Sequence, residues 1–276
     1  METTAAKPVL EAVSISKSFG EKRVLADVSF SAEEGEFVCI VGPSGTGKTT
    51  LLRALSALGS IDSGEVRING TQITRPPAEL SVVFQDYSRS LMPWMRVGKN
   101  IELPLRRYKM PAAERAERSK EALRDVGLEH AEHLYPWEMS GGMQQRAAIA
   151  RSLAYRPEVM IMDEPFASVD AQTRADLEDL MLDIRSRLGV TIVLVTHDIE
   201  EAVYLGDKVI VLSGKPASVS ATVAVPLGRD RDQIATKSRP DYLELRATIH
   251  EMIMATASSS LPEPPSGAHL TGIGSR

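Results

Sequence analysis

The amino-acid sequence predicts an α/β fold built on a mostly parallel sheet that is covered by helices. Short apolar runs, rich in β-branched residues or methionine, alternate with segments of helical periodicity. This alternation is typical of a buried parallel sheet. Shorter, half-polar runs predict a small antiparallel sheet near the N-terminus, and a long stretch without strands predicts a helical insertion between the two halves of the α/β core.

Five apolar runs lack the polar alternation of half-exposed strands, and helical segments separate them. The expected buried strands are Val38–Val41, Val82–Phe84, Val159–Met162, Thr191–Val195 and Val209–Leu212. The expected helices between them are Thr49–Leu58, Ala171–Leu188 and Ile199–Leu205.

The flanking segments have other patterns. The expected antiparallel strands, bounded by glycine turns, are Leu10–Ser16, Ala26–Ser31 and Glu65–Ile68. The expected helices of the insertion, which runs from about Val97 to Ala154, are Ala112–Val126 and Ser140–Ala154. Pro240–Met254 is expected to form an amphipathic helix, and residues 255–276, rich in Ser, Pro and Gly, are expected to form a disordered tail.

Composition excludes several classes of function. The 276-residue chain has a formal net charge of −5, which argues against a strongly basic nucleic-acid surface. Its single cysteine, Cys39, permits no disulfide within the chain and suits a reducing compartment. No run approaches the ~18 apolar residues of a membrane span, and the first eight residues lack the apolar core of a signal peptide. We therefore expect any membrane function to depend on a partner protein.

The phosphate loop, Gly42–Thr49, matches the pattern G-x-x-x-x-G-K-[ST] between an apolar strand and a helix. Its glycines let backbone N–H groups approach phosphate oxygens, and the helix N-terminus adds partial positive charge. Lys48 is expected to face the β- and γ-phosphates, and the Thr49 hydroxyl to bind Mg²⁺. A chance match in a glycine-rich turn is the alternative, and the loop alone does not separate kinases, GTPases and motor ATPases. The expected nucleotide contacts here are Gly42, Pro43, Ser44, Gly45, Thr46, Gly47, Lys48, Thr49 and Thr50.

Two acids end the apolar run Val159–Met162. An acid at the carboxyl end of a strand beside a phosphate loop can hold the water shell of Mg²⁺, and Asp163 fits this role. Glu164 follows directly, where its carboxylate can polarise a water for attack on the γ-phosphate. A helix-capping acid pair is the alternative interpretation.

Three further polar positions can complete the site. His197 follows an apolar strand and can contact the γ-phosphate, although a histidine in this position is more often structural. Gln85 can ligate Mg²⁺ or sense the γ-phosphate through its side-chain oxygen, but a single glutamine does not by itself indicate either role. Ser140–Gly142 opens a helix and offers N–H groups and a hydroxyl to an anion, or merely caps the helix. Because a second anion site is redundant within a monomer, we expect it to serve the nucleotide of a neighbouring subunit.

In order and spacing, these residues resemble the ATP-binding cassette (ABC) ATPase family over residues 9–225. The matching motifs are Gly42–Thr49 as the Walker A loop, Gln85 as the Q-loop, Met139–Met143 as the signature, Met162–Glu164 as the Walker B motif with its catalytic glutamate, Ser168–Asp170 as the D-loop and His197 as the switch histidine. Phe19 falls where the family places an aromatic ring that stacks on adenine. Met139 and Met143 depart from the usual Leu-Ser-Gly-Gly-Gln, and Phe19 replaces the commoner tyrosine.

The resemblance implies ATP hydrolysis with ATP and Mg²⁺ as cofactors. The implied catalytic residues are Glu164, His197, Lys48 and Gln85, and the implied Mg²⁺ ligands are Thr49, Gln85 and Asp163. The further nucleotide contacts that it implies are Phe19, Ser140, Gly141, Gly142 and Asp170. The signature residues would act across a head-to-tail homodimer.

The resemblance also implies an organisation and partners. A P-loop NTPase (RecA-like) core spans about residues 9–86 and 156–225, with the N-terminal antiparallel β subdomain and an inserted α-helical subdomain at about 87–155. A helical extension follows at 226–254, and then the tail at 255–276. The implied partners are integral membrane permease subunits and, indirectly, a solute-binding protein, with no nucleic acid, and the implied location is peripheral, on the cytoplasmic face of the inner membrane.

Three longer matches imply the kind of transport. The segments that resemble importers for nitrate, sulfonates and taurine are Phe84–Trp94, Tyr135–Arg146 and Asp163–Ala167. A chromosome or DNA-repair ATPase is an alternative, but it would carry a long coiled coil between Walker A and the signature. A translation factor is a second alternative, and it would normally carry two cassettes. The sequence shows neither feature.

The segment Gln85–Asn100 is expected to dock a cytoplasmic helix of the permease. Its apolar residues, interrupted by Pro93, are too irregular for a core strand and too apolar for a free loop. These residues are Leu91, Met92, Trp94 and Met95. Burial of all four in the helical subdomain is the alternative.

Overall fold

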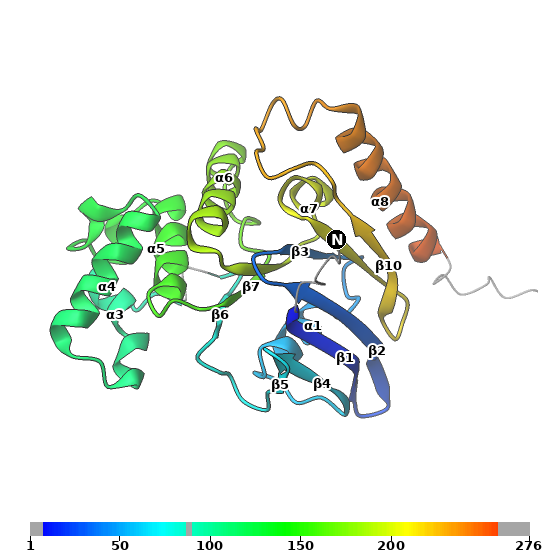
Figure 1. Cartoon of the computed structure of the whole chain (residues 1–276), viewed down its shortest axis with the longest axis horizontal. Coiled ribbons are helices and arrows are strands. Elements are labelled where there is room, and N and C mark those ends of the chain that lie inside the picture. Colours follow the sequence, from blue (N-terminus) through cyan, green and yellow to red (C-terminus); the bar gives the residue numbers. More distant parts are fainter. Residues whose placement is uncertain (1–7, 87–89, 259–276) are drawn as a thin grey trace, which may run out of the picture.

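The computed structural model describes residues 8–86 and 90–258, with side chains as far as Ala255. Two sheets stand side by side, and a helical part lies beside them (Figure 1). Within the described ranges, no helix combines the length and the apolar character that a membrane span requires. Part of the expected docking segment, residues 87–89, and most of the expected tail, residues 259–276, lie outside the described residues.

The main sheet has six strands in the order β10-β9-β3-β8-β7-β6. The five parallel strands are β3 (Phe37–Val41), β6 (Leu80–Val83), β7 (Val159–Asp163), β8 (Thr191–Val195) and β9 (Lys208–Ser213). An edge strand, β10 (Ser218–Ala224), pairs antiparallel with β9. Side chains of β3 alternate between two core clusters, with Phe37 and Cys39 on one face and Val38 and Ile40 on the other. Both faces are therefore buried, which explains the uninterrupted apolar runs.

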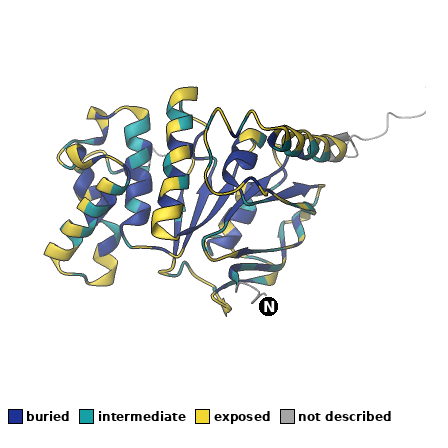
Figure 2. Cartoon of the chain, turned by 45° about the horizontal axis from the view of Figure 1, so that its top comes forward, coloured by how far each residue is buried: buried dark blue, intermediate teal, exposed yellow. Residues whose placement is uncertain are grey.

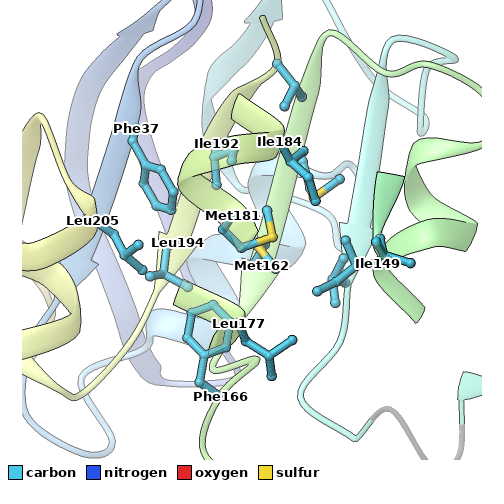
Figure 3. Close-up of a cluster of buried hydrophobic side chains, with 14 of the residues drawn as sticks. Phe37, Ile149, Met162, Phe166, Leu177, Met181, Ile184, Ile192, Leu194 and Leu205 are labelled. Atoms are coloured by element: carbon cyan, nitrogen blue, oxygen red, sulfur yellow. The ribbon is translucent and has the colours of Figure 1, made fainter. Parts of the chain in front are cut away.

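Helices cover the main sheet on both faces. On one face, α6 (Ala171–Leu188) and α7 (Ile199–Leu205) pack against it, and Figure 3 shows side chains of α6 among those of the strands. On the other face, α1 (Lys48–Leu55) packs together with the antiparallel sheet. Figure 2 shows the inner strands of the main sheet as buried and most helices as buried only in part. The helix expected to reach Leu58 ends at Leu55, and Ala57 takes a positive φ of 52°.

The predicted small antiparallel sheet is confirmed, and its strand order is β2-β1-β4-β5. Its strands are β1 (Pro8–Phe19), β2 (Lys22–Glu33), β4 (Ser63–Ile68) and β5 (Thr71–Gln72). Strands β1 and β2 are much longer than predicted, because they form one continuous hairpin. Shifts of register between them keep the strands paired past their irregular positions.

The helical part contains the two predicted helices, α4 (Ala112–Asp125) and α5 (Gly141–Leu153). It also contains α3 (Val97–Glu102) and three 3₁₀ turns, Pro104–Tyr108, Glu129–Ala131 and Pro136–Glu138. No strand occurs in its described residues, as predicted.

The C-terminal helix α8 (Pro240–Ser258) packs on α7, where Tyr242 and Ile249 are buried. The expectation that the disordered tail begins at residue 255 is wrong, because the helix continues to Ser258. Ala255 favours helix, and the first proline after it is Pro262.

Candidate functional site

The phosphate loop leaves the carboxyl end of β3 and opens α1. Gly47 adopts a φ of 98°, and a β-carbon there would lie 2.8 Å from Cγ1 of Val24, so only glycine fits this turn. The ammonium group of Lys48 donates hydrogen bonds to the carbonyl oxygens of Gly42, at 2.8 Å, and Pro43, at 3.2 Å. The loop therefore wraps closely around the ammonium group of Lys48, the first residue of α1.

Two carboxylates stand at the carboxyl end of β7, near this cation. Asp163 is buried, and its pKa is raised by burial and by the neighbouring Glu164, while Lys48 opposes the shift. Burial in turn lowers the pKa of Lys48, and the charges of Glu164 and Asp163 oppose that change. Asp163, Glu164 and Lys48 are thus electrostatically coupled.

Glu164 is the point where three distant segments meet. Its backbone has a positive φ of 42°, which is unusual for a residue with a side chain, and its N–H donates to the carbonyl oxygen of Val195 at 2.8 Å. Its Oε2 lies 3.0 Å from Nδ1 of His197 and accepts a hydrogen bond from Nε2 of Gln85 at 3.4 Å. A carboxylate held in this way at the edge of the sheet can act as a base toward a bound water.

The turn at Ser140 and the turn at Asp170 are in contact. The Ser140 hydroxyl caps α5 by accepting the N–H of Met143 at 3.3 Å. Asp170 caps α6, accepting the N–H of Thr173 at 3.0 Å and its hydroxyl at 2.7 Å, and the hydroxyl bond holds the pKa of Asp170 below its usual value. A β-carbon on Gly142 would lie 2.6 Å from Cγ2 of Thr173, so the two turns pack without a gap.

The Ser140 turn lies in a different part of the chain from the phosphate loop. Ser140 and Gly141 are exposed. Figure 1 places α5 in the helical part and α1 under the main sheet. The structure therefore does not bring the two predicted anion sites together within one chain.

Phe19 ends β1, and 60% of its surface is exposed. The ammonium nitrogen of Lys17 lies 5.4 Å from the ring centroid. The partner strand β2 carries Val24, which bounds the phosphate loop at Gly47. The hairpin that carries Phe19 therefore lies against the phosphate loop and presents an aromatic ring to solvent.

The expected docking segment divides into a buried and an exposed part. Leu91 is buried in the core, so its expected role in docking is wrong, whereas Trp94 is 71% exposed. Buried Asn100 shapes the loop between them, because its side chain accepts the N–H of Met92 at 2.6 Å and donates to the carbonyl oxygen of Met95 at 2.9 Å. The backbone of this loop is thus fixed while Trp94 projects from it.

Sequence reasoning missed a second exposed tryptophan near this loop. Trp137 is 63% exposed and stacks on Tyr135 with ring centroids 4.4 Å apart. The guanidinium of Arg96 lies 5.6 Å from the Tyr135 ring centroid, so the stack adjoins the loop that carries Trp94. The pair of aromatic residues two positions apart, just before the Ser140 turn, is the signal that could have identified it.

The expected Mg²⁺ ligands offer three kinds of oxygen, from the hydroxyl of Thr49, the amide of Gln85 and the carboxylate of Asp163. Hard oxygen donors suit Mg²⁺, which usually keeps several waters and few protein ligands. The described residues contain no cluster of three or more His, Cys, Asp or Glu side chains suited to a metal. The donor set therefore fits a Mg²⁺ ion that is bound together with phosphates, but not a metal site built entirely from protein.

Comparison with known proteins gives one consistent result. Residues 25–167 match the family model described as ABC transporter. The chain is 41% identical over 253 residues to the nitrate import ATP-binding protein NrtD of Synechocystis sp., covering 88% of this chain and 94% of that protein. It is 39% identical over 226 residues to the aliphatic sulfonates import ATP-binding protein SsuB of Bacillus subtilis, covering 82% and 85%. The dimeric structure of the ATP-binding cassette MJ0796 in a post-hydrolysis state with ADP and Pi aligns with a TM-score of 0.67 and 32% identity, covering 78% of this chain and 98% of that one.

Proposed function

The chain belongs to the ABC transporter family of ATP-binding, ATP-hydrolysing subunits, and we propose that it drives solute import through a separate membrane permease. The observation that carries the proposal is the convergence of Gln85, Glu164 and His197 at the carboxyl edge of the main sheet. These residues come from three different strand ends, and their side chains would lie around a water that attacks a phosphate held by the phosphate loop.

We assign each of these residues a role in hydrolysis. Glu164 is the general base, His197 contacts the γ-phosphate, and Lys48 binds the β- and γ-phosphates. Thr49, Gln85 and Asp163 would hold Mg²⁺, which neutralises phosphate charge during transfer. The burial of Asp163 beside Glu164 supports this assignment, because it raises the pKa of Asp163 and a divalent cation would offset that effect by favouring the ionised form.

The complete nucleotide site is assigned to a head-to-tail homodimer. Ser140 and Gly142 of one subunit would face the phosphates bound by Lys48 of the other. The exposure of Ser140, and the position of α5 in the helical part while α1 lies under the main sheet, support this arrangement. Each chain carries one copy of each half, so a two-fold axis completes both sites. Asp170, which caps the helix beside the Ser140 turn, would lie at the same interface.

The domain limits follow the same assignment. The nucleotide-binding core would comprise about residues 9–86 and 156–225, and the helical part about 87–155. The C-terminal extension would begin near residue 226. The position of α8 on α7 supports counting this extension as part of the folded subunit.

The permease contact is assigned to the surface formed by Trp94 and the Trp137–Tyr135 stack. Large exposed aromatic side chains on a rigid loop are suitable anchors for a partner helix. The loop follows Gln85 along the chain, so a residue at the nucleotide and the contact surface belong to one segment. The permease would hold the subunit at the cytoplasmic face of the membrane.

The transported solute is assigned from relatives alone. Because one relative is named for nitrate import and another for aliphatic sulfonate import, we propose a small oxyanion or sulfonate as cargo. A solute-binding protein would deliver it to the permease without touching this chain.

The proposal is tested by Glu164→Gln. This variant should bind ATP and lose hydrolysis by about 10²–10⁴-fold, the usual scale for a general base. It should also accumulate as an ATP-bound dimer in size-exclusion chromatography, whereas the wild-type chain returns to monomers as it hydrolyses ATP. Near-normal turnover by the variant would refute the role of Glu164.

A further inference from the structure

A network of polar side chains, buried at Thr196 and Glu201, holds the backbone on both sides of His197. The hydroxyl of Thr196 donates to Oε2 of Glu201 at 2.6 Å and accepts the N–H of Asp198 at 3.0 Å. The carboxylate of Asp198 caps α7 by accepting the N–H groups of Glu200, at 2.8 Å, and Glu201, at 3.3 Å. The two residues that flank His197 are therefore both fixed to the first turn of α7.

Arg174 connects this network to α6. Its Nη1 donates to Oδ2 of Asp198 at 3.4 Å, and its Nε lies 3.7 Å from Oε1 of Glu201. That Nε is buried and has no hydrogen-bond partner among the described residues. The N–H of Arg174 donates to the carbonyl oxygen of Asp170 at 2.9 Å, so Arg174 stands one helical turn after Asp170. A displacement of the Asp170 turn therefore changes the distance between Arg174 and Glu201.

Glu201 is an unfavourable residue for a purely structural position. Only 4% of its surface is exposed, and Asp198 and Glu178 place further negative charge near it. A carboxylate that is buried beside other acids costs stability unless several partners compensate. An apolar side chain of similar size would fill the space between α6 and α7 at lower cost. The position therefore calls for a role beyond packing.

We propose that Glu201 is a positioning residue for His197, acting through the Thr196 hydroxyl, and that Arg174 links its carboxylate to the Asp170 turn. The inference rests on the proposed contact between His197 and the γ-phosphate. Movement of the Asp170 turn at the dimer interface would draw Arg174 toward Glu201 or away from it. The imidazole would then be aligned only in the assembled site. Neither Glu201 nor Arg174 needs to touch the nucleotide.

Single variants of the full chain give the first test, with steady-state ATPase kinetics as the measurement. Glu201→Gln and Thr196→Val should each lower kcat by about 10-fold to 100-fold, the scale of a misplaced catalytic group, and leave KM for ATP within about 2-fold. Thr196→Ser keeps the hydroxyl and should restore most of the activity. The matched control is Glu178→Gln, which removes a buried acid in the same helix interface. Glu178 bonds Lys237 and Gln233 rather than the residues around His197, so kcat should change little.

A double variant gives the decisive test. In a His197→Ala background there is no imidazole to position, so adding Glu201→Gln should lower kcat by less than about 2-fold. If Glu201→Gln lowers kcat by as much in that background as in the wild-type chain, or if Thr196→Ser is as inactive as Thr196→Val, the positioning role is refuted. Equal losses in Glu178→Gln would likewise refute it. Undiminished turnover in His197→Ala alone would overturn the proposed role of His197, and this inference with it.

Discussion

The ammonium nitrogen of Lys48 lies 2.8 Å from the carbonyl oxygen of Gly42, so the side chain at the start of α1 reaches back to the first residue of the loop that precedes it. The same cation lies near the carboxylates of Glu164 and Asp163, which oppose the lowering of its pKa by burial. One side chain thus connects the loop, the helix and the two acids of β7. The exposed Ser140 turn has no such connection to the loop.

Because the Ser140 turn and the phosphate loop lie apart in one chain, two inactive variants, one altered in each half of the site, should restore ATPase activity when they are mixed. Lys48→Ala should weaken ATP binding by about 10-fold to 100-fold, because a charge-assisted contact to phosphate is lost. Ser140→Arg should block the other half of the site. When the two variants are mixed, a hybrid dimer places both lesions in one site and leaves the second site intact. ATPase activity of the mixture should therefore exceed that of either variant alone.

The complementation test needs proof that subunits exchange. Differently labelled chains followed by fluorescence transfer provide this proof. Lys120→Ala, at an exposed position of α4, serves as a control that should bind ATP normally. A mixture that exchanges subunits yet never gains activity would contradict the composite site.

Phe19 offers a test of base recognition. Replacing it with alanine should raise the KM for ATP by an amount worth about 1–3 kcal/mol, the scale of stacking between a base and an aromatic ring. Because the ring is exposed, thermal stability should remain close to that of the wild-type chain. Phe19→Tyr keeps the ring and should keep the KM. An unchanged KM in a folded alanine variant would mean that adenine binds elsewhere.

Replacing either exposed tryptophan should uncouple ATP hydrolysis from transport and leave hydrolysis by the isolated subunit intact. Trp94→Ala and Trp137→Ala should spare the basal ATPase of the isolated subunit and lower permease-stimulated ATPase and solute uptake in proteoliposomes. Ile234→Ala, which changes an 80% exposed residue of the C-terminal extension, is the control and should leave both unchanged. Normal stimulation in both tryptophan variants would place the permease contact on another surface.

Glu201 predicts a specific dependence of stability on pH. Burial, together with Asp198 and Glu178, raises its pKa to about 7, from 4.5 for a free glutamic acid, although Thr196 and Arg174 oppose the shift. Because the folded chain binds this proton more tightly than the unfolded chain, the stabilisation is complete below about pH 4.5 and is lost as pH rises through 7. The loss should approach roughly 3 kcal/mol in the free energy of unfolding.

The difference in the free energy of unfolding between Glu201→Gln and the wild-type chain isolates the contribution of Glu201. Urea unfolding from pH 5 to pH 8 should show the variant gaining stability relative to the wild-type chain as pH rises. A constant difference across this range would mean that Glu201 titrates as an ordinary exposed acid does.

The sequence predicted the buried parts of the fold better than the residues that organise the site. Strands such as Thr191–Val195 are buried throughout and almost entirely apolar because both faces of the main sheet are covered, so composition alone identifies them. The six residues of α3 are too short to show helical periodicity. Edge strand β10 is only half-buried and contains serine and alanine, so it lacks an apolar run.

The roles of some side chains depend on tertiary contacts, which a local sequence pattern does not reveal. The phosphate loop and the acids of β7 have fixed spacing and could be assigned to one edge of the sheet in advance. Glu201, by contrast, looks like an ordinary acid in the first turn of a helix, where negative charge is favourable. Only the packing of α6 against α7 shows that it is buried beside Arg174.

The contact between Gly142 and Thr173 constrains how this protein can diverge. The obstacle to a side chain at position 142 is one methyl group, Cγ2 of Thr173. Serine at position 173 lacks that methyl group but retains the hydroxyl that bonds Asp170. Thr173→Ser is therefore the permissive step for packing, and the fold accommodates alanine at position 142 only after it. The order in which two substitutions can accumulate along a lineage is thus decided by a single carbon atom.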